Sequence, residues 1–256
     1  MLALTLTGCN STPNLPGFGR SDTALAMPDE GASNEQLEKN AEQYAKAYAS
    51  NQKDKGAAIN LSRTLRALDR KLQAIIIMRQ IAQYHPNDRD VLIELGKALA
   101  DGGKPQDAAP VLAQARNAGA PDWRLLSTYG TVLDQLDRHK DAQSSYQQAL
   151  QLAPDEPAIL NNLGLSYALD QNLPQAESTL RKAAAHPRAT RQVKENFALV
   201  LGLQGKFEEA EAVARTTLPA DAVSNNTSYL KQMMSQPANW AKLQSLEAKN
   251  KAKKKP

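Results

Sequence analysis

The side chains that could do chemistry in this chain are few: one cysteine and three histidines. A reactive thiol needs a neighbouring base or cation, and a metal site needs His, Cys or carboxylate ligands at short, fixed spacings. His85 and His186 each precede a proline, and His139 is expected in an exposed turn, so none has such a partner in sequence. Phosphate-binding glycine loops and nucleophile-elbow motifs are also absent. We therefore expect no enzyme, no metal site, no cofactor and no small-molecule substrate.

Cys9 stands in a context that favours modification over burial or catalysis. Residues 10–33, which follow it, are rich in Pro, Gly, Ser, Asn and Asp and show no helical period. Leu6-Thr7-Gly8-Cys9 resembles the bacterial lipobox, in which an apolar run ends in a small residue and a cysteine. Because no basic segment precedes this run, either translation starts upstream of Met1 or the match is accidental.

The lipobox resemblance implies a location for the protein. In lipoproteins the cysteine takes a diacylglyceryl group, and the peptide before it is removed, so residues 1–9 would be a signal remnant ending in the lipidated Cys9. Asn10, where an inner-membrane lipoprotein would carry Asp, implies an outer-membrane anchor with the body facing the periplasm. Residues 10–33 are then a flexible tether that spans roughly 25–30 Å.

Charge and composition point to a helical body that does not bind nucleic acid. Aromatic residues make up only 5% of the 256 residues, which suits closely packed helices. The formal net charge is +4, but without the lysines of residues 249–256 it falls to −1. This basic tail is a solubilising end or a contact for anionic lipid or other envelope polymers. No stretch reaches the roughly 18 apolar residues of a membrane span.

The chain contains an internal repeat of about 34 residues, a period typical of helical repeats. Alanine recurs at this interval at Ala74, Ala108, Ala142, Ala176 and Ala210. Twelve positions before each alanine lies a small residue, at Ser62, Gly96, Gly130, Gly164 and Ala198. Four positions after each alanine stand Met78, Leu112, Tyr146, Leu180 and Ala214. Each column is therefore expected to mark one structural position in successive repeats.

These columns resemble the tetratricopeptide repeat over about residues 55–223. The resemblance predicts an all-α protein, a right-handed α-solenoid of about five repeats, each formed by two antiparallel helices. Small residues let neighbouring helices approach, and large ones fill the space between them. Residues 34–54 and 224–248 read as helical caps for the two ends.

The first helix of each repeat is expected to line a concave groove that binds a partner. Asn60, Asn162 and Asn196 stand two positions before the small residue, where asparagine in this family often bonds a peptide backbone. They are either such a ladder or chance polar residues on a wet face. The lysine and asparagine arrangement that clamps a C-terminal carboxylate in some of these proteins is missing.

The predicted groove changes from basic to apolar along its length. Its N-terminal end carries Arg63, Arg66 and Lys97, and its other end carries Leu165, Leu169, Leu199 and Leu203. The leucines are either open to a partner or covered by a C-terminal segment that contains Leu230, Met233, Met234 and Trp240.

The layout as a whole, and the general run of residues 40–100, resemble the lipoprotein of the tight-adherence (Tad) family that assembles Flp pili. This resemblance implies a pilotin-like, non-enzymatic scaffold whose partners are a secretin or other pilus and secretion components. Two alternatives are a generic cell-envelope repeat lipoprotein and a soluble cytoplasmic repeat adaptor in which Cys9 is incidental.

Overall fold

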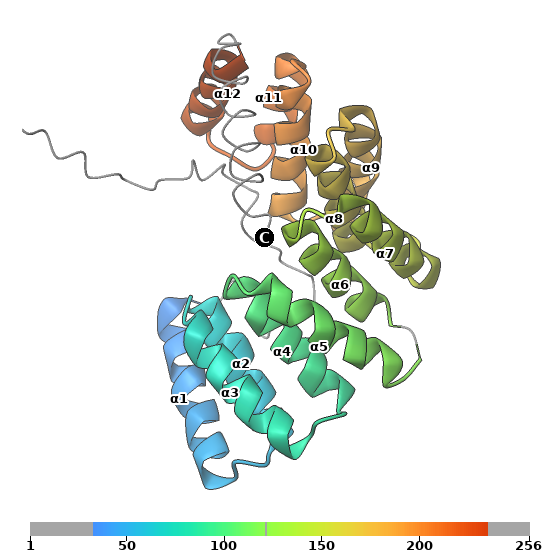
Figure 1. Cartoon of the computed structure of the whole chain (residues 1–256). Helices are drawn as coiled ribbons and strands as arrows, with labels where there is room; N and C mark the ends of the chain where they lie inside the picture. The colour runs from blue at the N-terminus through green and yellow to red at the C-terminus, as the bar shows by residue number, and fades with distance from the viewer. Residues whose placement is uncertain (1–32, 121, 235–256) are drawn as a thin grey trace, which may run out of the picture.

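A computed structural model of the chain describes residues 33–120 and 122–234, and within these ranges the protein is all-α (Figure 1). The helices are α1 (Asn34–Ser50), α2 (Lys55–Ala67), α3 (Lys71–Tyr84), α4 (Arg89–Asp101), α5 (Pro105–Asn117), α6 (Trp123–Gln135), α7 (His139–Leu152), α8 (Pro157–Leu169), α9 (Leu173–Ala185), α10 (Arg191–Leu203), α11 (Phe207–Ala214) and α12 (Ala220–Met234). Each packs antiparallel on the next along the chain. The predicted α-solenoid is confirmed.

The helices keep the period of the sequence. The first helices of successive pairs begin at equal intervals along the chain, at Lys55, Arg89, Trp123, Pro157 and Arg191. Directly before each stands a residue whose side chain accepts a hydrogen bond from a backbone N–H of the first turn: Asp54, Asp88, Asp122, Glu156 and Thr190. This column of N-caps satisfies donors that the helix itself leaves open.

The turn inside each pair also repeats. Residues one period apart adopt positive φ, at Asp69, Gly103, Asp137, Gln171 and Gly205. The following backbone N–H then reaches back to a carbonyl near the end of the first helix, as in the 2.8 Å bond from Asn172 N to Tyr167 O. This left-handed residue reverses the chain at the end of each first helix.

The small and large columns of the sequence meet between the two helices of one pair. A β-carbon at Gly130 would lie 2.6 Å from the Tyr146 ring, and one at Gly164 would lie 2.6 Å from Leu180. Tyr146 and Leu180 are both almost fully buried. The predicted packing of small on large residues therefore sets the distance between α6 and α7 and between α8 and α9.

The direction of curvature follows from which helices touch. The backbones of the first helices of successive pairs approach one another (α2 with α4, α4 with α6, α6 with α8, α8 with α10). In the described residues the second helices of successive pairs stand further apart and meet through long side chains, as in the ion pairs Arg79–Asp107 and Arg181–Glu209. The first helices therefore lie on the inner side of a curved stack, which Figure 1 shows. We call the surface that the first helices present on this inner side of the curve the inner face.

Helices occupy both ends of the described solenoid. Helix α1 occupies residues 34–50 of the segment predicted as the N-terminal cap. Helix α12 begins at Ala220, inside the range predicted for the repeats, directly after Pro219, a residue suited to a helix start. Residues 1–9 with Cys9, the predicted tether up to residue 32, the basic tail and residues 235–248 lie outside the described residues.

Candidate partner-binding face

The basic end of the inner face is a charge cluster that links α2 to α4. The carboxylate of Glu94 is buried and accepts hydrogen bonds from Arg66 Nη1 at 2.8 Å, Ser62 Oγ at 3.1 Å and Arg63 Nε at 3.3 Å. Arg66 also bonds Asp101, at the end of α4, at 2.6 Å. The sequence pattern predicted Arg66 in an open groove, but these bonds hold it between two helices.

Electrostatics keep this cluster ionised. Burial acts to raise the pKa of Glu94, but Arg66, Lys97 and Arg63 together outweigh it and hold that pKa below its usual value. Burial also acts to lower the pKa of Arg66. The neighbouring Glu94 and Asp101 outweigh burial, so the pKa of Arg66 is raised above its usual value. Breaking such a pair would leave one buried charge without its partner.

Among the three basic residues predicted to line the groove, Lys97 is the most buried. It is 4% exposed and, among the described residues, makes no hydrogen bond or ion pair. Burial is the main cause that lowers its pKa to about 8, and the nearby Glu94 only partly opposes this. The cluster therefore holds one cation more than its carboxylates neutralise.

The asparagines of the predicted ladder bond to protein groups on neighbouring helices. Asn162 donates to Ser127 Oγ of α6 at 3.4 Å, and Asn196 of α10 donates to Asn161 Oδ1 of α8 at 2.9 Å. Asn161 in turn donates to Asn162 Oδ1 at 3.2 Å. The chain of amides is buried and joins three repeats. Asn60 on α2 is half-buried and takes no part in it.

Sequence reasoning missed Asn161, the residue that makes this connection. It stands one position before Asn162, so a search for a single column of amides passes over it. The adjacent pair "NN" in a first helix was the available signal. The interhelical bonds account for these asparagines without a ligand, and a bound peptide would have to use their remaining hydrogen-bonding capacity.

The apolar end of the inner face remains partly open. Leu165, Leu199 and Leu203 are half-buried, and Leu169 is 41% exposed. Of the residues predicted to cover them, Leu230, Met233 and Met234 belong to α12, and Trp240 lies outside the described residues. Four leucines on α8 and α10 thus form an apolar surface next to the buried amides.

His139 differs from the exposed turn residue expected from the sequence. It begins α7, is largely buried, and its Nδ1 lies 2.9 Å from Asp134 Oδ1, the oxygen that also accepts the Ser166 hydroxyl at 2.7 Å. Tyr146 donates to the other oxygen of Asp134 at 3.0 Å. In a hydrolytic triad the imidazole stands between the hydroxyl and the carboxylate. Here both bond the same carboxylate, so the arrangement joins α6, α7 and α8 without forming a triad.

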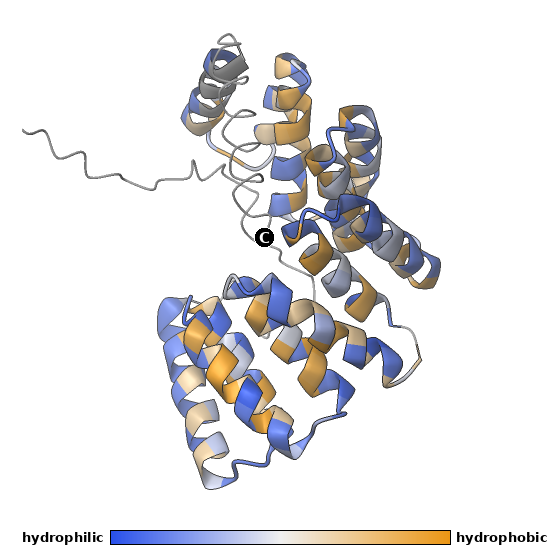
Figure 2. Ribbon diagram, viewed as in Figure 1, coloured by the Kyte–Doolittle hydropathy of each residue, from blue (hydrophilic) through white to orange (hydrophobic). Residues whose placement is uncertain are grey.

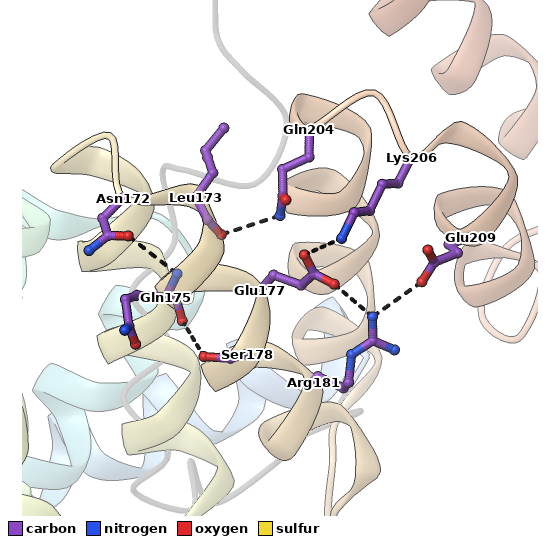
Figure 3. Close-up of polar contacts among 9 residues, drawn as sticks. All are labelled: Asn172, Leu173, Gln175, Glu177, Ser178, Arg181, Gln204, Lys206 and Glu209. Atoms are coloured by element: carbon purple, nitrogen blue, oxygen red, sulfur yellow. Dashed lines mark hydrogen bonds and ion pairs between the residues drawn. The ribbon is translucent and has the colours of Figure 1, made fainter.

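A surface hollow of about 680 Å³ lies where α9 meets the turn between α10 and α11. Figure 3 shows Glu177 between Lys206 and Arg181, with bonds of 2.6 and 2.8 Å, and Arg181 reaching on to Glu209 at 3.2 Å. Bonds from Lys206 and Arg181 are the main causes that lower the pKa of Glu177 to about 2. These charges pair with one another and join two repeats.

The described part of the chain offers neither a membrane span nor a metal site. Within residues 33–120 and 122–234, none of the helices is both long enough and apolar enough to cross a bilayer. In the same ranges, no group of three or more His, Cys, Asp or Glu side chains is arranged to hold a metal ion.

Known proteins share this architecture. A tetratricopeptide-repeat model matches residues 129–191, and another matches residues 198–216. The structure of YrrB, a tetratricopeptide-repeat protein with an unusual peptide-binding site, is similar with a TM-score of 0.50 and 19% identity, over 74% of this chain and 99% of YrrB. PilW, a widely conserved type IV pilus biogenesis factor, is similar with a TM-score of 0.62 and 15% identity, over 72% of this chain and 92% of PilW.

A curated relative extends the comparison to sequence. The uncharacterized protein y4yS of Sinorhizobium fredii is 32% identical over 124 residues, which are 46% of this chain and 68% of y4yS. Together with the repeated helix pairs, these matches show that the chain is a tetratricopeptide-repeat protein, a class that binds protein partners, and that it belongs to the same family as y4yS.

Proposed function

We propose that this protein is a non-enzymatic outer-membrane lipoprotein that acts as a scaffold in the assembly of an Flp pilus and tight-adherence secretion system. Its lipid, on Cys9, supplies the location, and its inner face binds a partner such as the secretin. The observation that carries this proposal is the change of chemistry along that face, from the partly exposed Arg63 beside the buried Lys97 to the leucines of α8 and α10.

This gradient defines the partner's chemistry. Arg63 is partly exposed, and the cluster around it has a surplus of positive charge, so it favours an acidic group of the partner. Leu165, Leu169, Leu199 and Leu203 favour apolar side chains, which bury surface that water otherwise meets. A segment with acidic residues toward α2 and apolar residues toward α10 fits both ends.

The biological assignment is supported by likenesses in sequence and in fold. The lipobox-like sequence at Cys9 and the resemblance to Tad lipoproteins suggest an anchored pilus component. PilW, a pilus biogenesis factor, has a similar fold, and YrrB is a solenoid of this kind with a peptide-binding site. At 15% and 19% identity, these two structures support the fold on which the proposal is built.

The anchor is tested by fractionating cells that express the parent chain or Cys9→Ser, with mass spectrometry of the N-terminal peptide. We expect a diacylglyceryl adduct and outer-membrane location for the parent, and release of the variant with an unchanged melting temperature, because the anchoring free energy lies in the acyl chains. A variant that still sediments with outer membranes contradicts the anchor.

The partner face is tested by co-purification of the secretin with Leu165→Asp/Leu199→Asp and with Leu169→Asp. Both should lose the secretin, whereas Leu152→Asp, at an exposed leucine that ends α7, should retain it. Because the half-buried positions of the double variant risk unfolding, the exposed Leu169 provides the decisive comparison. If Leu169→Asp and a folded Leu165→Asp/Leu199→Asp both recover as much secretin as the parent, the proposed role of this face is contradicted.

A further inference from the structure

Two large apolar side chains stand exposed on the outer face of α3. Leu72 is 66% exposed and Ile76 is 63% exposed, the two largest values among the big hydrophobic residues of the described ranges. They are four positions apart, so they lie one turn apart on the same side of the helix. Figure 2 shows hydrophobic residues on the side of α3 that is turned toward the viewer.

The fold does not require apolar residues at these places. The positions equivalent to Leu72 in the later repeats are occupied by Gln106, Lys140, Pro174 and Glu208. Those equivalent to Ile76 are occupied by Pro110, Ser144, Ser178 and Ala212. Four other repeats therefore form the same helix pair with polar or smaller residues, which leaves the leucine and isoleucine of α3 without a structural role in their own repeat.

These side chains lie at the end of the solenoid where the N-terminal segment enters. Helices α1, α2 and α3 alternate in direction, so the start of α1 and the start of α3 lie at the same end. A 2.7 Å ion pair between Glu38 of α1 and Arg70, the residue before α3, fixes this proximity. The chain that carries Cys9 therefore joins the solenoid at the end of α1 that lies near the start of α3.

The charges around the two residues are balanced, two basic and two acidic, so they do not oppose contact with a lipid surface. Lys71 pairs with Asp69 at 2.8 Å and Arg79 pairs with Asp107 at 2.9 Å, and all four side chains are well exposed. Long basic side chains of this kind keep their charge in water or at headgroups while neighbouring apolar residues are buried. Two side chains are also far too small for a stable dimer interface, which buries about 800 Å² on each partner.

We propose that Leu72 and Ile76 form a membrane-contact patch, which seats the N-terminal end of the solenoid on the lipid surface to which Cys9 is tethered. This inference rests on the lipid anchor of the proposed function. A tether of residues 10–33 holds the patch at a high effective concentration near the bilayer, so a contact too weak to bind alone becomes populated. The contact would orient the inner face relative to the membrane.

The test uses the single cysteine of the chain. Full-length protein is coupled through Cys9 to a maleimide phospholipid in phosphatidylcholine vesicles, so that the anchor is present whether or not cells acylate this residue. Tryptophan is introduced as Leu72→Trp or, as the matched control, Leu152→Trp, and the emission of the parent with its own tryptophans is subtracted. Lipids brominated on the acyl chains then quench residues that enter the bilayer.

We expect at least twofold stronger quenching and a blue shift for Leu72→Trp, and neither for Leu152→Trp. Equal quenching of the two reporters overturns the proposal. In the parent, coupling to vesicles should slow the amide exchange of residues 71–84. This slowing should be absent in Leu72→Gln/Ile76→Ser, whose new side chains are those of the equivalent residues Gln106 and Ser144 in later repeats. Slowing of the same size in this variant as in the parent, or a parent dimer in sedimentation that the variant abolishes, also overturns it.

The two proposals fail separately. Mass spectrometry of Cys9 from cells reports on the anchor alone, and the chemically coupled vesicles report on the patch alone. A native diacylglyceryl adduct with equal quenching of both reporters would leave the lipoprotein and remove the patch. A missing adduct would remove the natural anchor whatever the vesicles show.

Discussion

Gly130 lies so close to the ring of Tyr146 that a β-carbon at residue 130 would come within 2.6 Å of it. The contact joins α6 to α7 in the third repeat, and the ring is held further by a hydrogen bond from its hydroxyl to Asp134 at 3.0 Å. The tyrosine therefore cannot move aside without losing a buried bond. This pair makes the repeat packing directly testable.

Gly130→Leu should lower the free energy of unfolding by about 1–3 kcal/mol, because the side chain is forced between packed helices. Ala142→Leu, at a fully buried alanine of α7, should act in the same way. Gly119→Ala is the control, since its β-carbon would meet only Arg89 at ordinary contact distances. Chemical denaturation measures all three, and unchanged unfolding of both leucine variants would contradict the assigned packing.

Gln171→Gly should raise the free energy of unfolding by about 1 kcal/mol, because a left-handed conformation costs a residue with a side chain more than it costs glycine. Gln171 lies in the turn directly after α8 and has a φ of 62°. Gly205→Ala, at the equivalent turn with a φ of 77°, should lower stability by a similar amount. Thermal unfolding that moves in the opposite direction for either variant would argue against this turn geometry.

Lys97→Met should stabilise the protein at pH 7 by about 2 kcal/mol, because it removes a charge that burial disfavours. The pKa of Lys97 is lowered from its ordinary 10.5 to about 8 in the folded protein. Between these values the unfolded chain binds more protons, so the stability of the parent rises with pH. Urea titrations from pH 7 upward through this window should therefore show the advantage of the variant shrinking, and a constant difference would contradict the prediction.

Glu177→Gln should lower the free energy of unfolding at pH 7 by about 1–2 kcal/mol, reduced from the full pKa effect because its partners are partly exposed. Its pKa is lowered from 4.5 to about 2, so its contribution is present above pH 4.5 and is lost as the pH falls toward 2. The difference between parent and variant should vanish over that window.

The matched control for Glu177 is Glu35→Gln, which removes the solvent-exposed pair with Lys39 and should have little effect. Denaturant unfolding at pH 7, 4 and 2 measures both variants. Equal losses for Glu35→Gln and Glu177→Gln at pH 7 would show that the ion pairs of Figure 3 do not join the fourth and fifth repeats as described.

The sequence by itself determined the repeat architecture. A side-chain column that recurs once in every repeat is local information, because each helix pair packs in the same way on the next and the same position meets the same environment. The alanines, the small residues and the large residues that face them could therefore be assigned before any coordinates were known. The N-cap column from Asp54 to Thr190 keeps the same period, but it was identified only from the helix starts of the structure.

The tertiary structure alone decided which side chains of the inner face are open. Arg66 and Lys97 have the spacing of groove residues, but their burial depends on the neighbouring helix. Arg66 bonds the buried Glu94 and so lies between α2 and α4. Asn162 likewise donates to Ser127 of α6, and Asn196 donates to Asn161 of α8. Asn161 also donates to its neighbour Asn162. A periodic pattern specifies the direction of a side chain; its partners, its exposure and its pKa arise from residues that are brought together only when the helices stack.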